Sequence, residues 1–108
     1  MDDATPLLTA VDRLADRLRT LSQSRLRQGA AAEGLALARE LSLRAQRLEE
    51  PGTTPRTMPD AGMFAVADQL AVAGHDLAHA LERAPGDGAR ELAEAVTLVT
   101  ETAARCGV

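Results

Sequence analysis

With 108 residues, the chain has the length of a single domain. Its apolar residues are mostly Leu and Ala, Phe64 is its one aromatic residue, and Ile, Tyr and Trp are absent. This composition argues against a β-sheet, which favours β-branched and aromatic side chains. The net charge of -4 argues against a general nucleic-acid-binding protein, because such proteins are basic.

All twelve basic residues are Arg, and Lys, Asn, Ile and Tyr, whose codons are AT-rich, are absent. This bias indicates a high-GC bacterium, such as an actinobacterium. The start Met1-Asp2-Asp3 lacks the basic and apolar regions of a signal peptide, and no window approaches the roughly 18–20 apolar residues of a membrane span. A single cysteine, Cys106, excludes an intrachain disulfide. We therefore expect a cytoplasmic protein with no membrane span.

The first predicted helix covers about residues 5–28. Thr5 would cap its N-terminus, Pro6 suits its first turn, and Gly29 would end it. Arg25 continues the apolar stripe, so we expect that the helix leaves the core there or that Arg25 meets an acid. The stripe follows alternating steps of four and three residues, which places it on one helix face. It consists of Leu7, Val11, Leu14, Leu18 and Leu21.

The second predicted helix covers about residues 30–49. The run Ala30-Ala31-Ala32 favours helix, so the first two helices could also be one continuous helix, which Gly29 and Gly34 disfavour by about 1 kcal/mol each. Three Pro and one Gly within residues 51–59 cannot continue a helix. We interpret that segment as an extended, mobile connection. The apolar stripe of the second helix comprises Leu37, Leu41, Ala45 and Leu48.

The third predicted helix covers about residues 60–84, with Asp60 as its N-cap. After a Pro- and Gly-rich turn at residues 84–88, a fourth helix covers about 87–106, and Gly107 would end it. The two apolar stripes again follow steps of four and three. They comprise Met63, Ala67, Leu70, Gly74, Leu77 and Leu81, and then Leu92, Val96, Val99, Ala103 and Cys106.

These elements predict an all-α fold with a single domain over residues 1–108. Short connections join the first helix to the second and the third to the fourth, so each pair should be antiparallel. The simplest arrangement is a four-helix up-down-up-down bundle of two antiparallel helical hairpins.

A candidate metal site lies in the third helix. His75 and His79 are four residues apart, so they share a helix face and could bind one metal ion. The spacing matches the His-Glu-x-x-His pattern of zinc proteases, with Asp76 in place of Glu. Glu82 is the one nearby candidate for a third ligand. Both His residues lie away from the apolar stripe, which also fits two solvent-exposed side chains.

Residues 13–27 are locally basic and are opposed only by Asp16. The cluster could bind phosphate or an acidic partner, or it could pair with the eight acidic residues of the segment 51–108. Nucleic acid is not expected, because aromatic side chains for base stacking are lacking. Cys106 falls on an apolar stripe, which indicates a core residue. The charged patch consists of Arg13, Arg17, Arg19, Arg25 and Arg27.

Four large apolar residues lie off the main stripes. Single exposed apolar residues are ordinary, but four of them in three helices indicate a second contact surface, for which a homodimer is the preferred explanation. The alternative is a bundle whose buried faces are wider than the stripes. These interface candidates are Leu35, Leu43, Val72 and Leu98.

No motif assigns the chain to a family. In length, in its Ala- and Leu-rich composition and in its acidity, it is similar to the small helical-hairpin proteins of actinobacterial type VII secretion. It has neither the Trp of their W-x-G turn nor the Tyr of their C-terminal secretion motif. A Pro-rich segment, residues 51–59, stands where a tight hairpin would be. The resemblance is therefore one of format.

No phosphate-binding loop, nucleophile elbow or Cys cluster is present, and no cofactor is predicted. We expect a non-enzymatic protein–protein interaction module, homodimeric or bound to another protein with an acidic or helical surface. The alternative is a small-ligand or metal-binding bundle that uses His75 and His79.

Overall fold

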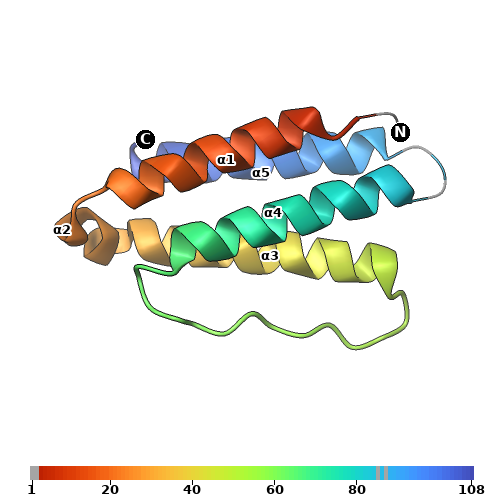
Figure 1. Ribbon diagram of the computed structural model, residues 1–108, viewed down its shortest axis with the longest axis horizontal. Helices are drawn as coiled ribbons and strands as arrows, with labels where there is room; N and C mark the ends of the chain where they lie inside the picture. The colour runs from red at the N-terminus through yellow and green to blue at the C-terminus, as the bar shows by residue number, and fades with distance from the viewer. Residues whose placement is uncertain (1–2, 85, 87) are drawn as a thin grey trace.

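The computed structural model describes residues 3–84, 86 and 88–108, and over these residues the protein is all-helical (Figure 1). The predicted four-helix bundle is confirmed. Two short helical segments, α2 (Gln23–Arg25) and η1 (Leu26–Ala30), lie between the first two long helices. The long helices are α1 (Thr5–Thr20), α3 (Ala31–Glu49), α4 (Val66–Arg83) and α5 (Ala89–Cys106). None of the described helices is both long and apolar enough to cross a membrane.

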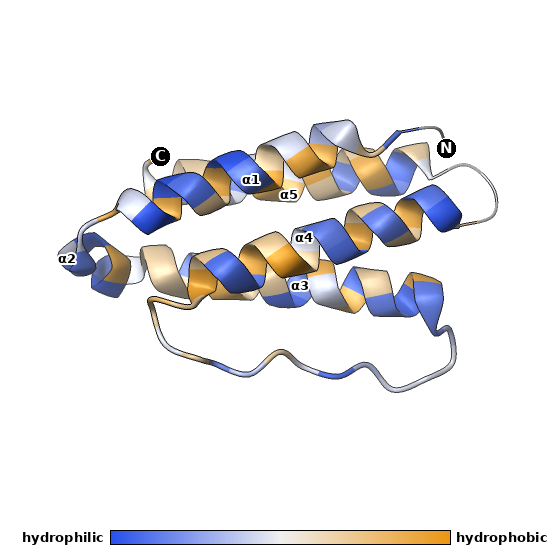
Figure 2. Cartoon of the chain, in the orientation of Figure 1, coloured by the Kyte–Doolittle hydropathy of each residue, from blue (hydrophilic) through white to orange (hydrophobic). Residues whose placement is uncertain are grey.

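The core follows the predicted apolar stripes, which Figure 2 shows as bands of apolar residues along each helix. Leu48 is an exception, because 37% of its surface is exposed. Leu21, Met63, Leu92, Val96 and Ala103 are only partly buried. The stripe residues that are buried are Leu7, Val11, Leu14, Leu18, Leu37, Leu41, Ala45, Ala67, Leu70, Gly74, Leu77, Leu81, Val99 and Cys106.

The two ends of the predicted first helix differ from expectation. Thr5 is the first helical residue and not the cap. The carboxylate of Asp3 accepts hydrogen bonds from both the backbone N–H (2.9 Å) and the hydroxyl of Thr5, so Asp3 satisfies the free backbone donor at this helix start. The hydrogen bond from the Thr5 hydroxyl lowers the pKa of Asp3.

The predicted single helix over 5–28 is wrong after Thr20, where α1 ends and the short segments α2 and η1 follow. Ser22 has an extended backbone, and its hydroxyl accepts a hydrogen bond from the N–H of Arg25 at 3.1 Å, which starts a new helical segment. Gly29 has φ 144°, outside the helical region, so the first two long helices are not one continuous helix. The first long helix therefore ends before Arg25, which is exposed, and Leu26 directly after it is buried again.

The predicted start of the third helix at Asp60 is also wrong. The Asp60 carboxylate accepts a hydrogen bond from the N–H of Gly62 at 2.8 Å, a local turn that competes with helix. Gly62 has φ 92°, and α4 begins only at Val66. The connection between α3 and α4 therefore covers residues 50–65, and we call it the strap. The predicted fourth-helix start, Asp87, lies outside the described residues.

The direction of α4 differs from the up-down-up-down prediction, because α4 runs parallel to α3 (Figure 1). Gly34 near the start of α3 lies against Val66 at the start of α4, while Leu48 and Ala80 near the two helix ends line one hollow. The helices joined by short connections, α1 with α3 and α4 with α5, run in opposite directions as predicted, but the antiparallel pairs that pack extensively are α1 with α4 and α3 with α5. The physical reason is the strap, whose sixteen residues can reach about 53 Å at roughly 3.3 Å per residue. That is enough to return along the whole of α3.

Candidate functional site

The three candidate metal ligands do not come together. The Nε2 atom of His75 lies 2.8 Å from a carboxylate oxygen of Asp12 on α1. Nε2 of His79 lies 3.5 Å from the guanidinium of Arg83. The Glu82 carboxylate accepts a hydrogen bond from the backbone N–H at position 4, at 3.4 Å. Among the described residues there is no group of three or more His, Cys, Asp or Glu side chains placed to hold a metal ion.

The five arginines of the charged patch do not act as one cluster. Arg19 forms ion pairs with Asp16 on its own helix and with Asp68 on α4, both at 2.8 Å. Arg25 donates to the backbone carbonyl of Cys106 at the end of α5, at 3.0 Å, a favourable position for a cation. The other three are exposed and form no ion pair with the described residues: Arg13, Arg17 and Arg27.

Cys106 is buried. Its thiol lies 3.8 Å from the carbonyl oxygen of Ala30, so the end of α5 rests on the kinked segment before α3. Burial raises the pKa of the Cys106 thiol, and the nearby carboxylate of Glu33 raises it further, against the opposing effects of Arg105 and Arg25. A buried thiol with a raised pKa is a poor nucleophile, so Cys106 serves packing.

The interface candidates separate into two groups. Leu35 is 9% exposed and belongs to the core, so it offers no surface to a partner, and Leu98 is half-buried against that core. The reason is that α3 and α5 each pack against two long helices, which widens their buried faces beyond the predicted stripes. Leu43 is half-buried. Val72 alone of the four is exposed, at 59%.

The most exposed large apolar residue of the described chain is not among the four predicted interface candidates. Phe64 lies in the turn before α4 and is 74% exposed. It borders a hollow of about 140 Å³ whose apolar wall includes Leu21, Leu26 and Met63. The signal was present, because Phe64 is the only aromatic residue of the chain. It was overlooked because residues 60–65 were expected to be helical.

Phe64, directly before α4, and Val72, on α4, are both exposed. At about 100° per residue, Val72, Asp68 and His79 point away from the core stripe of α4, and all three are exposed. Phe64 precedes all three in sequence and lies directly before the start of α4. We call this surface the α4 outer face, and it comprises Phe64, Asp68, Val72, His75 and His79.

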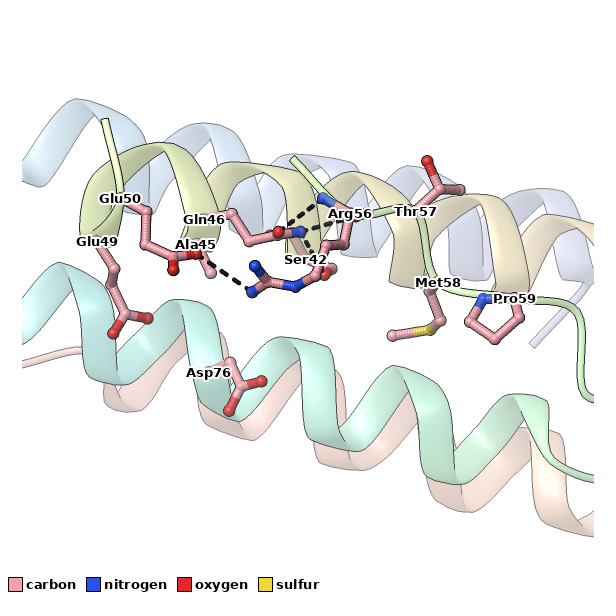
Figure 3. Close-up of a pocket in the computed structure, with 10 residues that line it drawn as sticks. All are labelled: Ser42, Ala45, Gln46, Glu49, Glu50, Arg56, Thr57, Met58, Pro59 and Asp76. Carbon is pink, nitrogen blue, oxygen red and sulfur yellow. Dashed lines mark hydrogen bonds and ion pairs between the residues drawn. The ribbon is translucent and has the colours of Figure 1, made fainter. Parts of the chain in front are cut away.

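The strap borders a second surface feature, an open groove of about 550 Å³ between α3, the strap and Asp76 of α4 (Figure 3). The Gln46 side chain accepts a hydrogen bond from the N–H of Arg56 at 2.8 Å and donates to its carbonyl at 2.9 Å. The guanidinium of Arg56 pairs with Glu50 at 3.2 Å. Gln46 thus holds the strap to α3, and the pair of Arg56 with Glu50 lies within the strap.

Comparison of the chain with protein-family models, with curated proteins and with solved structures found no match.

Proposed function

We propose that the protein is a non-enzymatic, cytoplasmic protein–protein interaction module that forms a homodimer through the α4 outer face. The observation that carries the proposal is the 74% exposure of Phe64. Aromatic anchors dominate the binding energy of protein interfaces. Burying a Phe or Val side chain contributes about 1.5–3 kcal/mol, and Val72 is the second exposed apolar residue of this surface.

Charge supports a second copy as the partner. The acidic Asp68, which pairs with Arg19, lies near the start of the α4 outer face, and His79 lies at its end beside the exposed Arg83. In a two-fold symmetric dimer the same patch faces itself in the opposite direction. The acidic start of each face would then lie opposite the basic end of the other. The apolar side chains Phe64 and Val72 would be covered in both copies.

The test is the mass of the protein by light scattering over a 100-fold range of concentration. We expect the parent to shift from monomer to dimer, and Phe64→Ser to remain monomeric over the same range. Phe64 lies outside the core, so circular dichroism of the variant should match that of the parent.

Leu48→Ser is the matched control, because Leu48 is exposed on α3 and lies off the α4 outer face. It should dimerise like the parent. A parent that stays monomeric at every concentration, or a Phe64→Ser variant that dimerises as well as the parent, would contradict the proposal.

A further inference from the structure

The first and second halves of the chain interlock. The first half, residues 3–49, supplies α1 and α3, and the second half, residues 66–108, supplies α4 and α5. Both α1 and α3 pack against α4 and against α5, whereas α1 and α3 lie diagonally across the bundle and form no extended interface within the described residues. Likewise, α4 and α5 meet only over a short stretch. Each half therefore buries its apolar faces mainly against the other half.

The polar contacts between long helices follow the same rule. Over the described residues, every ion pair between two long helices joins one half to the other. On one side of the bundle these pairs link α1 to α4, and on the other side they link α3 to α5. They are Asp12 with His75, Arg19 with Asp68, Glu33 with Arg105, and Arg44 with Glu94.

The strap is the only covalent link between the halves, and it contributes little to the core. The side chains of the strap are mostly exposed. Met58, near the middle of the strap, is partly buried and packs on the core. Arg39 donates to the carbonyl of Met58 at 2.8 Å, and Gln69 donates to that of Pro59 at 2.9 Å. With the Gln46 contacts, these bonds hold the strap without making it part of the bundle interior.

We propose that the fold supports a second, exchanged form, in which α1 and α3 of one copy pack with α4 and α5 of another, and that the length of the strap sets which form is populated. Such a dimer re-forms every interface between the halves, and only the path of the strap changes. Two bundles lying side by side in opposite directions place the end of α3 in one next to the start of α4 in the other. The surface that a second copy binds is then the interior of the bundle.

Strap length decides between the closed monomer and the exchanged dimer. In the closed chain the strap must return from Glu49 to the level of Gly34, a rise of about 22 Å at roughly 1.5 Å per residue. The long strap spans this easily and holds the two halves at a high effective concentration, which favours the monomer. A strap too short for the return leaves only the exchanged dimer, because short hinges favour swapping.

The first test deletes residues 51–61, which leaves a link with a reach of about 18 Å. The matched control replaces the same residues with a Gly/Ser linker of equal length, so that both variants lose the same strap contacts. We expect the deletion variant to be a dimer with the helix content of the parent, and the control to be a monomer at the same concentration. A deletion variant that is a folded monomer, or that is unfolded while the control folds, would overturn the proposal.

The second test uses full-length chains and does not depend on the deletion. Leu41→Asp places a charge in the core of the first half, and Leu77→Asp does so in the second half, since both side chains are fully buried. Refolded separately, both variants should lack helix. Refolded together, they should recover about half of the parent helical signal, because exchange assembles one intact bundle from the two undamaged halves. No gain on mixing would refute exchange.

These results are separable from the α4 outer face. Phe64→Ser introduced into the deletion variant should leave its dimer intact, because exchange uses the core and not Phe64. Loss of that dimer would show that association occurs through the outer face instead.

Discussion

Gly74 of α4 lies so close to Val11 of α1 that a Cβ atom on Gly74 would come within 2.5 Å of the Val11 Cγ1 atom. Val11 is β-branched and stiff at χ1, so it cannot turn aside within the packed core. We expect Gly74→Ala to lower the free energy of unfolding by about 1–3 kcal/mol through overpacking, although Ala gains up to about 1 kcal/mol in helix propensity over Gly. Urea denaturation measures this change.

A double-mutant cycle with Val11→Ala tests the cause of this loss. Removing the two methyl groups of Val11 makes room for the Ala side chain. The double variant should therefore be more stable than the sum of the two single changes predicts. Strict additivity would show that the close approach of Gly74 and Val11 does not set the cost.

Two leucines of predicted stripes should differ in their contribution to stability. Leu77 is 1% exposed, whereas Leu48 is 37% exposed. We expect Leu77→Ala to cost about 2–5 kcal/mol, as truncation of a buried Leu does, and Leu48→Ala to cost clearly less, since surface changes stay near 0.5 kcal/mol. Guanidinium denaturation of both variants checks the order. Equal losses would contradict the burial described for α3 and α4.

The strap should open when its contact with α3 is removed. Gln46 makes two hydrogen bonds to the backbone of Arg56, so Gln46→Ala should accelerate tryptic cleavage after Arg56 several-fold, with a smaller effect on the melting temperature. Local opening governs such cleavage. Gln28→Ala is the control, because the Gln28 side chain of η1 donates a hydrogen bond to Ser24 of α2, away from the strap. Unchanged cleavage of Gln46→Ala relative to this control would count against the strap contacts.

The thiol of Cys106 should ionise at higher pH in the folded protein than in the urea-unfolded chain, because burial raises its pKa from the ordinary value of 9.0. The rate of reaction with a disulfide reagent, measured against pH in both states, reports the ionisation. The neutral buried thiol contributes stability that is fully present below the unfolded pKa and is lost as the pH rises through the folded pKa. A native thiol that reacts at lower pH than the unfolded one would contradict this assignment.

Periodicity was enough to predict the helices and most of the core, because Leu at steps of three and four has no stable alternative to helix burial. Periodicity carried no information on the direction of α4 relative to α3, since the same apolar stripe can pack against a parallel or an antiparallel neighbour. The predicted start of α4 was wrong for a local reason. Asp60 is equally suited to a helix cap and to a turn, and Gly62 at φ 92° decided for the turn.

The candidate sites were harder to predict, because exposure depends on which sides of a helix its neighbours cover. Leu35 and Val72 look alike in sequence, each an apolar residue off its stripe. Leu35 is buried because α3 packs against both α4 and α5, whereas Val72 lies on the outward side of α4. Similarly, the side chain of His75 pairs with Asp12, which comes from another helix and is not visible in the local pattern.

The interlocking of the two halves has a consequence for the rate of folding. In an up-and-down bundle, neighbouring helices in sequence can pair early, because few residues separate their contacts. Here α3 can pair with α4 only after the long strap closes, and the contacts of α1 with α4 or α5 require closure of a loop that includes both α3 and the strap. Folding slows as contacts become more distant in sequence. This chain should therefore fold more slowly than an up-and-down bundle of the same length and stability, and its folding rate should respond to the length of the strap.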